Sequence, residues 1–147
     1  MRRSTVLVLD GDDLVRASLA AFLREEGFAV REAADGKEAA AALTWLPDPA
    51  VMVADPWTCP PLPGWAAARE ACRRRPTIGI VYASSAMGAA AARLPGGQEC
   101  VLPKPFAPPL LARLVRELTG RPAWAQAAGD HVAGSAGPMT AGLPPGG

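Results

Sequence analysis

Three acidic residues gather within four positions near the start of the chain. In the stretch TVLVLDGDDLVR, Asp10 directly follows an apolar run, Gly11 comes next, and Asp12 and Asp13 complete the group. Carboxylates this close repel one another, and each loses hydration energy if it is even partly buried. The stretch therefore predicts either acids that lie in water or a site where a positive group lies among them.

Two further residues follow apolar runs in the same way. Asp55 comes after residues 50–54, and Lys104 comes after residues 100–102 in a chain with two lysines against 13 arginines. Mg²⁺ prefers oxygen ligands, a carboxylate can attack phosphorus, and a lysine ammonium neutralises phosphoryl oxygens. Two acids and a lysine at one place would therefore suit a hard cation together with a phosphoryl group.

The rest of the chain must bring these residues together. Apolar runs predict five strands, and apolar residues at helical spacing predict five helices that alternate with them. The strands are predicted over residues 6–9, 28–30, 50–54, 78–82 and 100–102, and the helices over residues 15–23, 39–46, 65–72, 86–94 and 110–118. This alternation is typical of an α/β fold with a doubly wound parallel sheet. Ligands bind at the carboxyl ends of such strands, where Asp10, Asp55 and Lys104 are expected to meet.

Composition limits the classes of partner. The chain has 147 residues, half of them apolar, and a net charge of +1, which gives no field that would favour nucleic acid or an anionic membrane. The three cysteines show neither metal-ligand nor disulfide spacing. No segment approaches the ~20 apolar residues of a membrane span. We therefore expect a cytoplasmic protein that binds neither nucleic acid nor membrane.

The composition changes near residue 120. Residues 121–147 are rich in Ala, Gly and Pro, lack apolar periodicity and contain the single histidine, His131. Such a segment cannot bury enough apolar surface to fold. We predict one domain over residues 1–120, followed by a disordered tail in which His131 is solvated.

Residues 4–119 resemble the receiver domain of two-component response regulators. The likeness rests on Asp10 with Arg16 six residues later, DGKEAAAAL after the second strand, Asp55 with a proline-containing loop before Gly64, and Lys104–Pro105–Phe106. The resemblance implies a flavodoxin-like (βα)5 fold with a five-stranded parallel sheet in the order 2-1-3-4-5. It also implies a cis bond between Lys104 and Pro105, and a stand-alone receiver, because no output domain is evident.

The resemblance further implies a function for the strand-end residues. Asp55 would accept a phosphoryl group from a histidine kinase or phosphotransfer protein, and Lys104 would bind that group. Mg²⁺ would be held by Asp10, Asp55 and the backbone carbonyl of Trp57. The chain would signal through a downstream protein or a homodimer. It would not be an enzyme beyond self-phosphorylation from a small phosphodonor and slow loss of the phosphate.

Three positions depart from the family pattern. Gly11 stands where the family has its second acid, the direct metal ligand, so Mg²⁺ binding is expected to be weak. Asp12 is predicted either to substitute as a ligand or to cap the following helix, and Asp13 is predicted to cap it. Tyr82 takes the place of the small hydroxyl residue that ends the fourth strand, and Val101 takes the place of the aromatic switch residue.

Two readings therefore stay open. Asp55 and Lys104 favour a phosphorylatable receiver, which we prefer, whereas Gly11 and Tyr82 favour a pseudo-receiver that binds partners independently of phosphorylation. A phosphohydrolase is disfavoured because Trp57 stands where such enzymes carry a second Asp. A nucleotide binder is disfavoured because no glycine-rich phosphate loop follows the first strand. DNA binding is disfavoured because neither a helix-turn-helix pattern nor a basic stripe follows residue 119.

Overall fold

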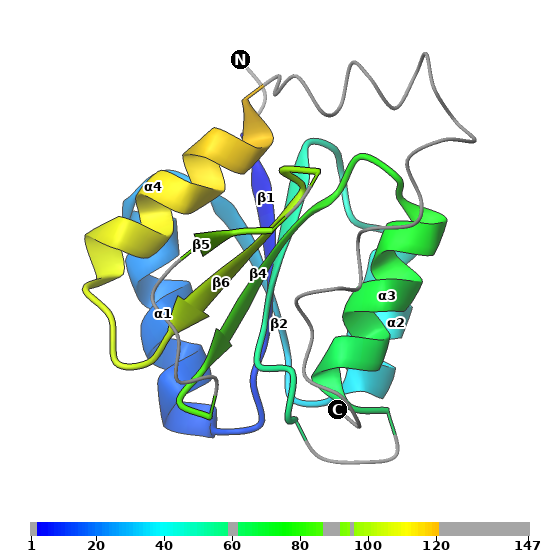
Figure 1. Cartoon of the computed structure of the whole chain (residues 1–147), viewed down its shortest axis with the longest axis horizontal. Coiled ribbons are helices and arrows are strands. Elements are labelled where there is room, and N and C mark those ends of the chain that lie inside the picture. Colours follow the sequence, from blue (N-terminus) through cyan, green and yellow to red (C-terminus); the bar gives the residue numbers. More distant parts are fainter. Residues whose placement is uncertain (1–2, 59–61, 87–91, 95, 121–147) are drawn as a thin grey trace.

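A six-stranded sheet with helices on both faces forms the part of the chain that the computed structural model describes, residues 3–58, 62–86, 92–94 and 96–120. The strands are β1 (Thr5–Leu9), β2 (Ala29–Ala33), β3 (Ala50–Ala54), β4 (Gly79–Ser84), β5 (Ala92–Arg93) and β6 (Glu99–Pro103). The helices are α1 (Asp13–Glu25), α2 (Gly36–Leu43), α3 (Gly64–Arg74) and α4 (Pro108–Thr119). Helices α1 and α4 cover one face and α2 and α3 the other (Figure 1).

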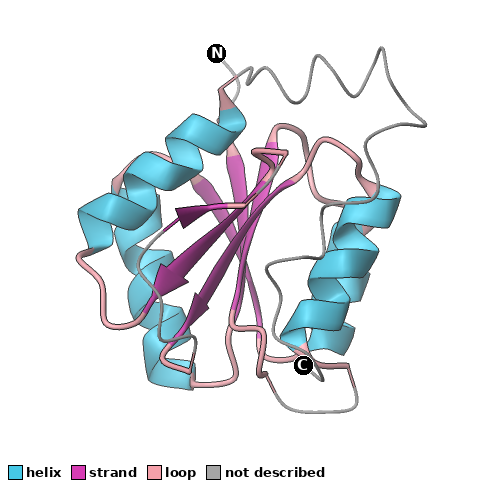
Figure 2. Ribbon diagram, in the orientation of Figure 1, coloured by secondary structure: helices cyan, strands magenta, loops and turns pink. Residues whose placement is uncertain are grey.

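The predicted fold class is confirmed. The sheet order is β2-β1-β3-β4-β6-β5, and every pair except β5 with β6 is parallel. Numbering only the parallel strands gives the predicted order 2-1-3-4-5, with the helices in a layer on each side (Figure 2). The Lys104–Pro105 bond is cis, as predicted.

The antiparallel strand β5 was not predicted. Residues 86–94 were expected to form an Ala-rich helix, which is wrong at Ala92 and Arg93, while residues 87–91 lie outside the described residues. Gly96 and Gly97 have φ values of 92° and 78°, a backbone region that glycine enters without steric cost. This reversal returns the chain onto the edge of β6 and explains the short strand.

Strands β1, β3 and β4 are buried along their whole length and read as nearly continuous apolar runs, because helices cover both faces of the sheet there. On the α1 and α4 side, Val8 and Val53 pack with Leu111 and Val115 of α4. On the other side, Leu7, Met52 and Ile80 pack against small residues of α2 and α3: Ala39, Ala67, Ala68 and Ala71. No helix within the described ranges is long and apolar enough to cross a membrane. The predicted tail, with His131, lies outside those ranges.

Helix α3 begins directly against the residue that follows β3. A Cβ placed on Gly64 would lie 1.9 Å from the carbonyl oxygen of Asp55. Any larger residue at this position must displace backbone rather than a mobile side chain. The start of α3 and the position of Asp55 are therefore linked.

We expect Gly64→Ala to lower the free energy of unfolding by about 1–3 kcal/mol, the usual cost of overpacking. Urea unfolding followed by circular dichroism measures the change. The matched control is Gly11→Ala, where an added Cβ would meet its nearest neighbours at 3.8 Å and the cost should stay within about 0.5 kcal/mol. Equal losses in the two variants would contradict this account of Gly64.

Candidate functional site

The ends of β1, β3 and β6 bring Asp10, Asp55 and Lys104 together. The Lys104 Nζ donates to Asp10 Oδ2 at 2.7 Å and to Asp55 Oδ2 at 3.3 Å. Asp10 is buried, with 5% of its surface exposed, and the side chains of Asp55 and Lys104 are 22% and 19% exposed. One ammonium group thus lies between two carboxylates in a partly buried place.

Backbone hydrogen bonds fix each of the three residues one position past its strand. The Asp10 N–H donates to the carbonyl of Ala33, the Asp55 N–H to that of Leu9, and the Lys104 N–H to that of Ser84, at 3.0–3.2 Å. The sheet's hydrogen-bond ladder therefore continues into the site. The sheet thus fixes the backbone from which each of the three side chains extends.

The remaining oxygen of each carboxylate is held by the backbone two residues further on. Asp10 Oδ1 accepts from the Asp12 N–H and Asp55 Oδ1 accepts from the Trp57 N–H, both at 2.9 Å. These are turns of the kind that Asp side chains commonly form. Both acids consequently present the same arrangement, one oxygen to a backbone N–H and the other to Lys104.

Lys104 remains charged at neutral pH. Partial burial alone would lower the pKa of its ammonium group. The hydrogen bond to Asp10 and the charges of Asp10 and Asp55 outweigh burial, so the pKa lies above its ordinary value. The site therefore holds a permanent cation beside two acids.

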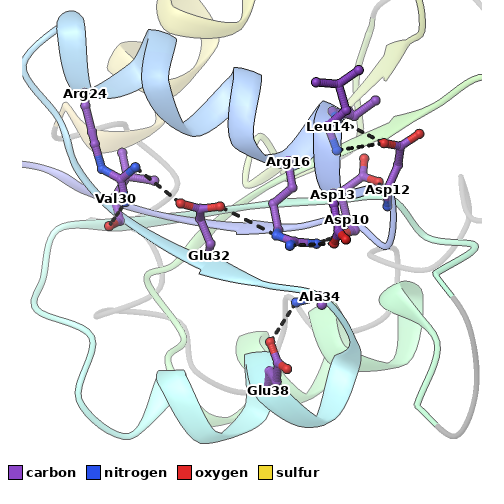
Figure 3. Close-up of polar contacts among 11 residues, drawn as sticks. Asp10, Asp12, Asp13, Leu14, Arg16, Arg24, Val30, Glu32, Ala34 and Glu38 are labelled. Carbon is purple, nitrogen blue, oxygen red and sulfur yellow. Dashed lines mark hydrogen bonds and ion pairs between the residues drawn. The ribbon is translucent and has the colours of Figure 1, made fainter.

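Asp12 and Asp13 serve the helix that follows. Asp12 is the N-cap of α1, and its carboxylate accepts from the N–H groups of Leu14 and Val15 at 3.0 and 3.1 Å (Figure 3). Asp13 is the first helical residue and pairs with Arg16 at 2.7 Å. The prediction that Asp13 caps the helix is wrong by one residue. Capping engages Asp12, the residue predicted either to cap or to substitute as a metal ligand.

Gly11, next to Asp10 in the chain, leaves room for a Cβ. A Cβ at this position would meet Ala34 O and Thr58 Cγ2 at 3.8 Å, an ordinary contact distance.

Thr58 is buried and donates through Oγ1 to the carbonyl of Asp55 at 2.7 Å. Sequence reasoning missed Thr58, although a threonine three residues after Asp55 can signal such a turn. Trp57 is 38% exposed next to it.

The structure does not bring Tyr82 to the acids. Strand β4 continues to Ser84, and its Tyr82 pairs with Ala54 of β3. The residues that follow these two, Ala83 and Asp55, therefore lie side by side. The Tyr82 ring is fully buried in the core under α2 and α3, and Val101 is its partner on β6. Ala83 rather than Tyr82 therefore occupies the position level with Asp55.

Tyr82 instead belongs to a second polar group that sequence reasoning missed. Its hydroxyl donates to Glu99 Oε2 at 2.5 Å. Glu99 is 3% exposed. Burial raises the pKa of Glu99, although the Tyr82 bond and the charge of Arg69 act against it. Burial also raises the pKa of Tyr82, and that of the Cys72 thiol to about 12.

The donor set at the strand ends fits a magnesium ion. Mg²⁺ is commonly held by one or two carboxylates and keeps several waters. Asp10, Asp55 and the Trp57 carbonyl would supply such a set. Among the described residues no group of three or more His, Cys, Asp or Glu side chains is arranged to hold a metal.

Comparisons with known proteins agree with the fold. No protein-family model matches the chain. It is 32% identical over 117 residues to the sensor kinase CckA of Brucella abortus, a match covering 78% of this chain and 12% of that protein's length. A solved response regulator receiver protein from Sinorhizobium medicae is 26% identical, with a TM-score of 0.67, over 80% of this chain and 95% of that one. The Francisella response regulator 1452 receiver domain is 24% identical, with a TM-score of 0.66, over 80% of this chain and 97% of that domain.

We expect the free energy of unfolding of Glu99→Gln to increase relative to that of the parent chain as pH rises. The pKa of Glu99 is raised from 4.5 on folding, so the folded chain binds the proton more tightly than the unfolded chain. The stability contributed by Glu99 is therefore complete below pH 4.5 and falls as pH rises through the raised pKa. Urea unfolding of both chains between pH 4 and pH 8 measures the difference.

Tyr82→Phe provides the control. It removes the hydroxyl that donates to Glu99 and should cost about 1–3 kcal/mol at neutral pH, because a buried acceptor loses its donor. A difference between Glu99→Gln and the parent chain that does not change with pH would contradict the burial argument.

Proposed function

We propose, on the premise that this chain has the fold of response regulator receiver domains and resembles them in sequence, that Asp55 accepts a phosphoryl group. The donor would be a histidine kinase or a phosphotransfer protein in the cytoplasm. The phosphorylated chain would then signal by contact with a downstream protein or a second copy of itself. The observation that carries the proposal is the single ammonium group of Lys104 between Asp10 and Asp55.

The chemistry follows from which oxygens are engaged. Asp55 Oδ1 is held by the Trp57 N–H, so Oδ2 is the oxygen that would attack phosphorus. A bond forms between Oδ2 and phosphorus, the bond from phosphorus to the donor breaks, and the donor leaves with that electron pair. Lys104, 3.3 Å from Oδ2, would pair with the transferred phosphoryl oxygens. When bound by Asp10, Asp55 and the Trp57 carbonyl, Mg²⁺ would neutralise further charge on that group.

A second candidate function is supported by the same ion pairs. Lys104 already neutralises both carboxylates, so a cation must compete with an ammonium group held within the chain. Gly11 supplies no second acid to favour the metal. A pseudo-receiver that binds its partner without phosphorylation would keep this closed arrangement permanently.

Incubation with acetyl phosphate and Mg²⁺ separates the two functions. We expect intact-mass spectrometry to detect the gain of one phosphoryl group by the parent chain, and none by Asp55→Asn. Asp48→Asn is the matched control, because Asp48 pairs with Arg75 rather than with Lys104 and should not affect the gain. No gain by the parent chain at saturating Mg²⁺ would favour the pseudo-receiver.

Gly11→Asp should strengthen Mg²⁺ binding. A Cβ at this position would make no close contact, and the backbone of Gly11 is outside the positive-φ region. An added carboxylate beside Asp10 should lower the dissociation constant for Mg²⁺ by about 10- to 100-fold. This is the effect that residues contacting a metal ligand commonly have on metal affinity. Titration calorimetry measures it, and Gly11→Asn, of equal size without the charge, should bind close to the parent value. Unchanged affinity in Gly11→Asp would mean that the metal does not lie beside Gly11.

A further inference from the structure

The guanidinium group of Arg16 contacts three separate parts of the fold. Nη1 donates to the backbone carbonyl of Asp10 at 2.9 Å, Nη2 donates to Asp13 Oδ1 at 2.7 Å, and Nε lies 3.6 Å from Glu32 Oε1. The side chain is only 16% exposed. Figure 3 shows the group lying between Glu32 and the turn that contains Asp10 and Asp13. Its planar arrangement of donors suits several acceptors at once, which a lysine cannot match.

These contacts tie the turn after β1 to the neighbouring strand. Glu32 lies on β2 and pairs with Val8 in the sheet register, two residues before Asp10. Arg16 itself lies in the first turns of α1. One side chain therefore joins the end of β1, the start of α1 and the edge strand β2.

The backbone carbonyl of Asp10 has Arg16 as its hydrogen-bond donor. In the described part of the chain it accepts no hydrogen bond other than the one from Arg16, and Asp10 itself is 5% exposed. The next residue is Gly11, whose backbone has more freedom than that of any other residue type. The peptide plane between Asp10 and Gly11 would therefore reorient readily without a donor on its carbonyl. Reorientation of this plane would shift the turn in which the Asp12 N–H donates to the Asp10 carboxylate.

We propose that Arg16 is a positioning residue, which holds the Asp10 main chain so that its carboxylate faces Lys104. The role deepens the proposed function, because it concerns the residues that would receive the phosphoryl group. Arg16 itself does not contact Lys104 or Asp55 in the described structure; it acts through the backbone of Asp10.

Arg24 is a natural matched control. It lies on the same helix and contacts the same Glu32 at 3.3 Å, and it also donates to the Val30 carbonyl at 3.2 Å. Neither contact involves the turn after β1. Arg24→Lys thus perturbs the same surface ion pairs without perturbing Asp10.

The first test measures amide hydrogen exchange in the full chain without metal or phosphodonor. The Asp12 N–H donates to Asp10 Oδ1 at 2.9 Å and so reports the orientation of that carboxylate. We expect Arg16→Lys to lower its protection about tenfold, the equivalent of one hydrogen bond, and Arg24→Lys to leave it unchanged. Amides of β3 report global stability and should stay protected in both variants. Unchanged protection of Asp12 in Arg16→Lys, or an equal loss in β3, would overturn the proposal.

The second test measures the initial rate of phosphoryl transfer from acetyl phosphate. We expect Arg16→Lys to take up the phosphoryl group about tenfold more slowly than the parent chain, because Asp10 would no longer be held in place beside Asp55. Arg24→Lys should react at the rate of the parent chain. Equal rates in all three chains would overturn the role. If the parent chain takes up no phosphoryl group, the proposed function fails, and the exchange experiment alone still decides whether Arg16 positions Asp10.

Discussion

The contact of one lysine with two aspartates organises this structure. Asp10 and Asp55 follow the neighbouring strands β1 and β3, and Lys104 follows β6, which β4 separates from β3. Each residue keeps a backbone hydrogen bond to a neighbouring strand. Two carboxylates at this depth would be costly without a cation, because burial penalises each charge and the charges repel one another. The ammonium group offsets both effects. A change in the ionic state of any one of the three therefore alters the environment of the other two.

Much of the fold could be predicted because its signals are local. Buried parallel strands appear as unbroken apolar runs, as in residues 50–54, and their alternation with helices leaves few possible topologies. The two acids and Lys104 could be found because each directly follows such a run. The antiparallel strand β5 could not, because Ala92 and Arg93 resemble helix and only the reversal at the following glycines decides otherwise.

The partners of individual side chains were harder to predict. Tyr82 and Glu99 are 17 residues apart, and only the pairing of β4 with β6 brings them together on the face covered by α2 and α3. The same register sets Ala83 level with Asp55. The N-cap of α1 differs from the prediction by one residue, because adjacent aspartates have the same capping propensity and only backbone geometry distinguishes Asp12 from Asp13.

The room for a Cβ at Gly11 has an evolutionary consequence. Gly64 tolerates no side chain because the backbone of Asp55 stands against it, whereas position 11 meets its neighbours only at ordinary contact distance. Every glycine codon becomes an aspartate or glutamate codon through a single base change. A lineage that carries this chain is thus one nucleotide away from an acidic residue at position 11, and the Cβ of that residue would meet no close contact.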